Sequence, residues 1–408
     1  MGERPGTESD AVLGVVPRLV LDPQDVEEAG AALGMCARDR LAVSFVGGGT
    51  ELGLGAPPSE LDAVLHTGAL CRIVEYAPAD QIVVAQAGLP LAALQRHLAP
   101  QGQWLALDPP WGGRATLGGI VAANAFGPRR ARYGSVRDLI VGISFVRADG
   151  TAAKGGGKVV KNVAGFDLPR LMVGALGTLG LITTVTFRLH PLPESGETVL
   201  FPGLDAAQVS SLGTSLRAAQ LEPSSSAALS SSDRFDLGVR FEGFAQGVAK
   251  QVEGLLELGL RMGLGGERLQ AAEAEAFWGR HDSVRELGPL RLKVAMPPSR
   301  FPDFAGTALP LLFGELSPAA SAWYPSLGIG FVAGRPAGTA SAAAAVDSAR
   351  GEALGLKGSL VVCEASQELR AAVDVWGPPP PAFELMQGLK NRLDPDRRLN
   401  RGRFMGGI

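Results

Sequence analysis

Three glycine-rich segments constrain the fold of the first half of this chain more than any other feature. The first, residues 46–50 (VGGGT), follows a β-type run, and the third, residues 174–180 (GALGTLG), precedes one near Ile182. The second, residues 115–127 (ATLGGIVAANAFG), opens an alanine-rich helix. Glycines let the backbone turn sharply and expose successive N–H groups. The fold must therefore place several tight turns beside strands and a helix.

A concave row of N–H donors, or a helix start with Gly and Thr, binds phosphate oxygens. A tight turn without a ligand, or close packing of a helix on a strand, explains any one of the three segments equally well. The first segment does not have the G-x-G-x-x-G spacing of a dinucleotide-binding motif. The sixth position counted from Gly47 should be glycine but is Leu52, and Gly53 comes one residue late. Three such segments together favour a long ligand whose diphosphate crosses several loops.

The chain has 408 residues, 46 % of them hydrophobic and 19 % charged, which is enough apolar material for a real core. Domains hold about 100–200 residues, so two are expected. Strands are predicted at residues 41–46, 81–87, 138–146 and 181–189, with a hairpin turn at 149–150 and a helix at 91–98. The Pro-Leu-Pro of residues 191–193 is the predicted boundary, giving domains at 1–193 and 194–408.

The second part also reads as α+β. Strands are predicted at residues 235–241, 290–295, 328–333 and 360–362, and a helix at 248–260. The serines at 224–226 and 230–232 suit either a linker or a loop, and we predict a loop inside this domain. A tail helix at 382–392 ends at Asp394-Pro395.

Several function classes are not expected. The net charge is −3, and the only basic group, at residues 129–132, is too small for a nucleic-acid surface. The three cysteines, Cys36, Cys71 and Cys363, suit a reducing cytoplasm and neither a disulfide framework nor an iron–sulfur cluster held by this chain alone. The N-terminus is polar, and no stretch of about 18 apolar residues occurs, so no signal peptide and no membrane span are expected.

In order and spacing, five motifs resemble the PCMH-type FAD-binding domain of vanillyl-alcohol-oxidase-like enzymes. They are VGGGT, ATLGGIVAANAFG, YGSVRD at 133–138, GKVVKNVAGFDL at 157–168 and VGALGTLGLIT at 173–183. The stretch GKVVKNVAGFDLPRL at 157–171 is similar to the family of FAD-binding E subunits of glycolate oxidase, as is Leu176, where many lactate- and glycolate-oxidising relatives have an acidic residue. The tail motifs at 373–378 and 389–404 support this, although Arg401 departs from the family's Asn-Pro-Gly-Arg.

The resemblance implies a two-part PCMH-type FAD-binding domain and a smaller α+β C-terminal cap domain, with the C-terminal tail returning to the FAD domain. Residues 47–50 would cradle the diphosphate, residues 116–119 would line its other side, and residues 177–182 would hold the adenosine end. FAD is expected to bind non-covalently, since the glycine loop contains no His or Cys. The predicted FAD-binding residues are Val46, Gly47, Gly48, Gly49, Thr50, Asp108, Pro109, Thr116, Leu117, Gly118, Gly119, Asn124, Gly127, Gly177, Thr178, Gly180, Ile182 and Asn400.

Catalytic residues are harder to predict. The four histidines, His66, His97, His190 and His281, have no metal-ligand spacing, and no metal is expected. The catalytic candidates are Lys158, Lys161 and His281, and each lysine could equally be an ordinary loop charge.

The resemblance implies an FAD-binding member of a cytoplasmic glycolate oxidase complex that oxidises glycolate, a small 2-hydroxy acid, to glyoxylate. The implied partners are a D-like glycolate oxidase flavoprotein and an F-like iron–sulfur protein, which could also hold the chain peripherally at the inner membrane. The alternatives are a self-sufficient FAD-dependent 2-hydroxyacid dehydrogenase and a non-catalytic, FAD-bearing structural component of an assembly.

Overall fold

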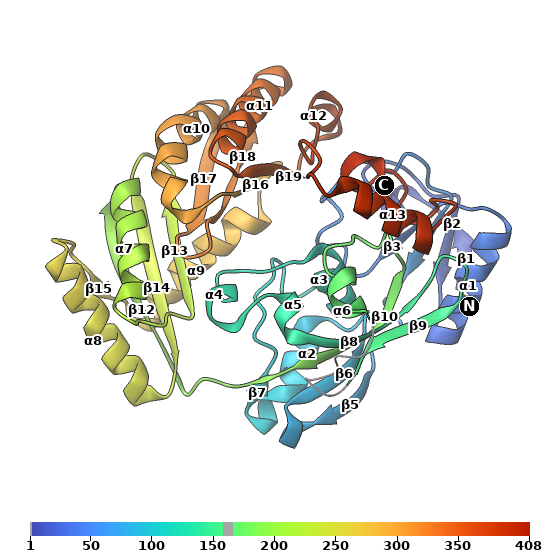
Figure 1. Cartoon of the computed structure of the whole chain (residues 1–408), viewed down its shortest axis with the longest axis horizontal. Helices are drawn as coiled ribbons and strands as arrows, with labels where there is room; N and C mark the ends of the chain where they lie inside the picture. Colours follow the sequence, from blue (N-terminus) through green and yellow to red (C-terminus); the bar gives the residue numbers. More distant parts are fainter. Residues whose placement is uncertain (1, 158–165) are drawn as a thin grey trace. The chain divides into compact units, whose positions relative to one another are not determined.

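The computed structural model describes residues 2–157 and 166–408. Its contacts group the chain into two compact units that are discontinuous in sequence (Figure 1). Unit 1 comprises Met1–Gly127, Gly134–Leu192 and Pro378–Ile408, and unit 2 comprises Pro128–Tyr133 and Pro193–Gly377. A single cut at residue 193 therefore does not describe where residues 128–133 and 378–408 belong.

Unit 1 contains two main sheets and a short two-stranded one. In the four-stranded sheet, β2, β4 and β3 run parallel and β1 pairs antiparallel with β2, whereas the five-stranded sheet is antiparallel throughout. In spatial order the strands are β1 (Gly2–Pro5), β2 (Leu19–Asp22), β4 (Ala63–His66) and β3 (Val43–Val46); β5 (Ile73–Ala77), β6 (Ile82–Gln86), β10 (Leu181–Arg188), β8 (Ile140–Val146) and β9 (Ala152–Gly156); and β11 (His190–Pro191) with β7 (Gln103–Trp104).

Several helices of unit 1 bury apolar side chains against these sheets. Leu94 of one helix, Leu117 and Ile120 of another, and Val185 and Phe187 of β10 belong to a single buried apolar cluster. Burying a side chain of this size contributes about 1.5–3 kcal/mol, so this cluster holds the five-stranded sheet and its helices together. The helices are α1 (Val26–Arg38), α2 (Leu91–Leu98), α3 (Leu117–Ala123), α5 (Val136–Leu139), α6 (Leu168–Met172) and α13 (Phe383–Leu393).

Unit 2 is built on one eight-stranded antiparallel sheet. Its strands, in spatial order, are β15 (Glu267–Arg268), β12 (Ser195–Leu204), β14 (Phe235–Gly243), β13 (Ser225–Ser230), β17 (Leu316–Tyr324), β18 (Ile329–Pro336), β16 (Leu290–Ala295) and β19 (Ser359–Glu364). Its helices are α4 (Arg130–Tyr133), α7 (Ala206–Ala218), α8 (Ala245–Arg261), α9 (Ala271–Glu286), α10 (Phe301–Glu315), α11 (Thr339–Gly355) and α12 (Gln367–Ala372).

Two neighbouring residues of β17 show that α9 and α10 cover opposite faces of this sheet. Trp323 stacks on Phe301 of α10, with ring centroids 4.4 Å apart, whereas the hydroxyl of Tyr324 lies 2.7 Å from Nε2 of His281 in α9. Because successive side chains of a strand point to opposite faces, the two helices lie on opposite sides.

The α+β fold and most predicted elements are confirmed, and two predictions are wrong. The serines around 224–232 do not form a loop, because Ser225–Ser230 is the fully buried strand β13, paired with β14 and β17. Small side chains suit a strand packed between two neighbours, although Ser and Ala favour strands weakly. The strand predicted at 138–146 begins only at Ile140, because residues 136–139 form a helical turn before β8. The N–H and the hydroxyl of Ser135 both donate to Asp138 Oδ2 at 2.7 Å and stabilise this turn.

The C-terminal tail packs on the first unit, as expected. Lys390 of α13 is 1 % exposed, and its Nζ donates to the carbonyl of Thr178 at 2.8 Å, to the carbonyl of Leu399 at 2.9 Å and to Asp394 Oδ2 at 2.7 Å. Asp394 is fully buried and also accepts from the N–H of Leu399 at 2.8 Å. Burial lowers the pKa of Lys390, while the Asp394 carboxylate opposes that shift and favours the charged amine.

Replacing Lys390 should destabilise unit 1 strongly. Lys390→Met leaves Asp394 as an unpaired buried charge, which costs about 3–5 kcal/mol of unfolding free energy. Urea unfolding of the variant measures this cost. Adding Asp394→Asn removes the unpaired charge and should restore part of the lost unfolding free energy. Lys154→Met, at an exposed position of the same unit, is the control, and a cost for Lys390→Met as small as the control's would contradict the account.

Candidate functional site

The three glycine segments of the sequence meet around one cavity in unit 1. The first segment contributes Gly47, the second contributes Gly118 and Gly119, and the third contributes Gly177 and Gly180. The remaining lining residues are Phe45, Thr67, Ala87, Ala122, Leu181 and Ile182. Six of the predicted ligand-binding residues, these five glycines and Ile182, therefore line a single cavity.

The first wall is the loop that follows β3. A Cβ atom at Gly47 would lie 2.3 Å from Oγ1 of Thr116, and one at Gly48 would lie 2.1 Å from the backbone carbonyl oxygen of Arg114. Gly49 has φ +70°, a conformation that other residues rarely adopt. Within residues 2–157 and 166–408, the N–H groups of residues 47–50 donate to no main-chain or side-chain acceptor. The loop thus offers a row of free donors, which suits an anion.

The second wall is the start of α3. The Thr116 side chain caps this helix by accepting a 3.4 Å hydrogen bond from the N–H of Gly119. The N–H of Gly118 donates to the carbonyl of Ala87 at 2.7 Å, and a Cβ atom at Gly118 would lie only 2.7 Å from the Cβ of Ala87. Glycine is therefore needed here for the helix to approach the end of β6.

The third wall is fixed by the C-terminal tail. Asn400 donates through Nδ2 to the carbonyl of Leu176 at 2.6 Å, and its N–H donates to the carbonyl of Val43 at 2.8 Å. A Cβ atom at Gly177 would lie 2.6 Å from that Nδ2 and 2.9 Å from the Phe45 ring. Oδ1 of Asn400 is buried and has no hydrogen-bond partner in the described chain. A buried polar atom left unsatisfied costs stability, so a donor on a ligand or a water would stabilise this oxygen.

Five residues of the cavity are missing from the predicted list, although Leu181 lies within the predicted range 177–182. Thr67 directly follows β4, and its N–H donates to the carbonyl of Val46 at 3.0 Å. Because β3 and β4 are parallel, their carboxyl ends meet at one edge, and this rule could have found Thr67. Phe45, Ala87, Ala122 and Leu181 carry no polar signal that would distinguish them from core residues.

The other predicted residues do not line this cavity. Asp108, next to Pro109, accepts the N–H of Gly127 through Oδ1 at 2.9 Å. Asn124 ends α3 with φ +50°, and its buried Oδ1 has no hydrogen-bond partner among the described atoms. Thr178 donates through Oγ1 to the carbonyl of Ala175 at 2.7 Å. Val46 and Leu117 are buried core residues. Thr50 is half-buried in the loop of the first wall, and Lys158 and Lys161 lie outside the described residues.

His281, the third catalytic candidate, is in unit 2 and is 1 % exposed. Its Nε2 lies 2.7 Å from the Tyr324 hydroxyl and its Nδ1 lies 3.0 Å from Asp282 Oδ1. Burial, and then the nearby Arg285 guanidinium, lowers the pKa of His281 to about 4. The imidazole is therefore neutral near pH 7, with both nitrogens engaged, and it ties α9 to the sheet.

Two further features are absent from the part of the chain that the structure describes. No group of three or more His, Cys, Asp or Glu side chains there could hold a metal ion. None of its helices combines the length and the apolar character needed to cross a membrane.

Comparison with known proteins agrees with this geometry. Residues 17–156 match the FAD binding domain family. The chain is similar to glycolate oxidase subunit GlcE of Escherichia coli (39 % identical over 160 residues, 38 % of this chain and 45 % of that protein) and to subunit GlcD of Bacillus subtilis (34 % over 194 residues, 47 % and 41 %). It is also similar to the mitochondrial D-2-hydroxyglutarate dehydrogenase of Bos taurus (34 % over 178 residues, 44 % and 33 %).

These matches span less than half the length of each of the three relatives. A structural comparison covers more: alkyldihydroxyacetonephosphate synthase superposes on 96 % of this chain and 78 % of its own, with a TM-score of 0.74 and 15 % sequence identity. At that identity the likeness concerns the fold alone. Residues 17–156 therefore match an FAD-binding domain, and the chain as a whole has a fold similar to that of alkyldihydroxyacetonephosphate synthase.

Proposed function

We propose that this chain is the FAD-binding component of a multi-subunit oxidoreductase that oxidises glycolate, a small 2-hydroxy acid, to glyoxylate. The observation that carries the proposal is the cavity where three glycine segments meet, in a domain that matches the FAD-binding family. The similarity to the glycolate oxidase proteins GlcE and GlcD supports the substrate and the assembly.

The residues around the cavity fit FAD. The free N–H groups of residues 47–50 would bind the diphosphate, and the buried Oδ1 of Asn400 would accept from the cofactor or its water. The predicted set Thr116, Gly118, Gly119, Gly177, Gly180 and Ile182 would line the rest of the site. Hydrogen bonds to a charged group are worth roughly 1.5–3 kcal/mol each, so a few of them support tight binding without a covalent bond.

Bound FAD supplies the two-electron acceptor, and the protein supplies binding and orientation. Oxidising an alcohol also requires removal of the hydroxyl proton, normally by a positioned base. His281 is a poor base for this purpose, because it is sealed from solvent and its pKa is about 4. We therefore infer that a partner flavoprotein similar to GlcD supplies the proton acceptor for glycolate.

The exit of electrons also requires a partner. Cys36 is buried, Cys71 is exposed and Cys363 is half-buried, and no metal-holding group occurs among the described side chains. A cluster needs several cysteine ligands together. An F-like iron–sulfur protein would accept the electrons, and the complex would be cytoplasmic or held at the inner membrane through these partners.

One alternative has support of its own. The similarity to D-2-hydroxyglutarate and D-lactate dehydrogenases favours a self-sufficient 2-hydroxyacid dehydrogenase. In that case Lys158 and Lys161 would be the first residues to test, since the structure does not describe them. The third possibility, a non-catalytic FAD-bearing component, predicts FAD that substrate never reduces within the complex.

Gly48→Ala should lower FAD affinity about tenfold or more, because the added Cβ would force the loop away from the Arg114 carbonyl and misplace its N–H donors. FAD content after purification and the Kd of the apoprotein measure this effect. Gly113→Ala is the matched control, since a Cβ atom there has no neighbour within 4 Å. Equal FAD content in both variants, with intact circular dichroism, would show that the loop is only a turn.

The isolated chain should not turn over glycolate at a useful rate. A positioned base is worth about 100- to 10,000-fold in rate, and His281, the one catalytic candidate among the described residues, is a poor base. Glycolate-dependent dye reduction should be compared for the chain, for the GlcD-like partner and for the reconstituted complex. We expect full activity only in the complex; equal activity of the isolated chain would favour the self-sufficient enzyme instead.

A further inference from the structure

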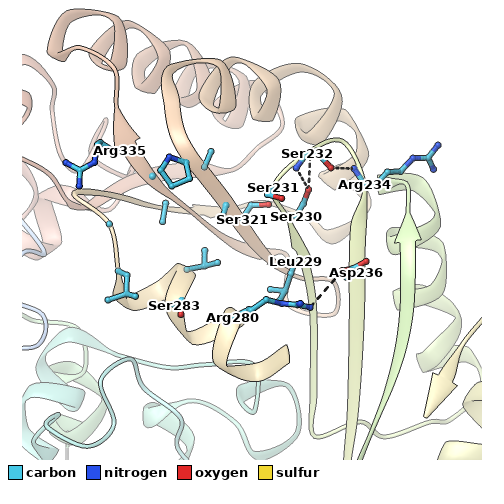
Figure 2. A pocket seen from close by; sticks show the side chains of 18 of the residues that line it. Leu229, Ser230, Ser231, Ser232, Arg234, Asp236, Arg280, Ser283, Ser321 and Arg335 are labelled. Carbon is cyan, nitrogen blue, oxygen red and sulfur yellow. Dashed lines mark hydrogen bonds and ion pairs between the residues drawn. The ribbon is translucent and has the colours of Figure 1, made fainter. Parts of the chain in front are cut away.

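Unit 2 contains a cavity of about 660 Å³ between the sheet and α9, shown in Figure 2. Small-molecule sites usually have volumes of about 300–1,000 Å³. Its lining comes from β13, β14, β17, β18 and α9, all of which belong to unit 2. The cavity is therefore a feature of this unit by itself, independent of the FAD cavity in unit 1.

The walls of the cavity are largely apolar. Val284 lies on the same face of α9 as Arg280, since residues four apart are neighbours on a helix, and Leu287 directly follows the end of α9. Leu229 and Ala320 line the sheet side. These side chains offer a surface for a hydrocarbon body and no hydrogen bonds to it.

The side chains that line the cavity carry more positive than negative charge. Arg234, Arg280 and Arg335 line it, against one carboxylate, Asp236. Arg280 pairs with Asp236 at the outer limit of an ion pair, with the two atoms 4.0 Å apart. Neither Arg234 nor Arg335 has an ion-pair partner in the described ranges. Figure 2 shows Arg335 on one side of the cavity and Arg280 with Asp236 on another.

We propose that this cavity binds an organic carboxylate with an apolar body of several carbon atoms. The guanidinium group carries a planar fork of donors that matches a carboxylate, and the apolar wall of α9 would cover the carbon chain. Glycolate, with two carbon atoms, would fill little of the volume. The proposal does not depend on FAD binding or on glycolate oxidation.

Binding of hexanoate to the full FAD-loaded chain tests the proposal. Hexan-1-ol, hexylamine and inorganic phosphate are the comparison ligands. Calorimetric titration should give a Kd of about 1 mM or tighter for hexanoate, at least tenfold tighter than for the other three. Binding should weaken at high salt, because the arginines are near the surface. Equal binding of hexan-1-ol, or of phosphate, would overturn the proposal, as would no hexanoate binding at all.

Variants locate the binding site. Arg335→Ala should weaken hexanoate binding about tenfold, and Ala320→Phe, which fills the cavity, should abolish it. Leu287→Asp, at an exposed position, gives a second test by placing a negative charge at the wall if Ala320→Phe does not fold. Arg261→Ala on α8, whose side chain is 65 % exposed, is the matched control and should change nothing. Unchanged binding in Arg335→Ala and Leu287→Asp would place the ligand elsewhere and overturn the proposal.

Discussion

The buried ion pair between Lys390 and Asp394 is the interaction on which the architecture of unit 1 most depends. It lies in the last helix and its cap, yet its amine also reaches the carbonyl of Thr178, 212 residues earlier in the chain. Two charges taken out of water stabilise a fold only when their geometry is good and hydrogen bonds compensate the lost hydration. Here the amine of Lys390 donates three hydrogen bonds and Oδ2 of Asp394 accepts two, so the pair ties the C-terminal tail to the third glycine segment.

The tail then organises the rest of the FAD cavity. Past the ion pair, Arg398 donates to the carbonyl of Ala148 at 2.7 Å, and Asn400 bonds to the carbonyls of Val43 and Leu176. Arg403 donates to the carbonyls of Leu52 and Leu54 at 2.7 and 2.8 Å, just after the first glycine loop. A loop held in place before the ligand arrives loses less entropy on binding. The tail therefore pre-organises the donors that would bind a diphosphate.

Much of this arrangement could be predicted from the sequence, because glycine has few structural reasons to recur beside strands. The three glycine segments were predictable in this way, whereas the return of the tail was predictable only from the family resemblance. The strand β13 was not, since serine and alanine give no β signal, and neither was the role of Lys390, which only long-range contacts reveal. The same holds for residues 128–133, whose Arg129 pairs with Glu242 at 2.6 Å, 113 residues later in the chain. Local patterns carry no information on such pairs.

The central claim is that the glycine cavity holds FAD through hydrogen bonds alone. Acid precipitation of the purified chain, followed by flavin analysis of pellet and supernatant, tests it most directly. The account predicts an equimolar amount of FAD in the supernatant and a colourless pellet, because no His or Cys occurs in the loop of residues 46–50. Flavin that stays with the precipitated protein, or protein that carries no flavin before precipitation, would contradict it.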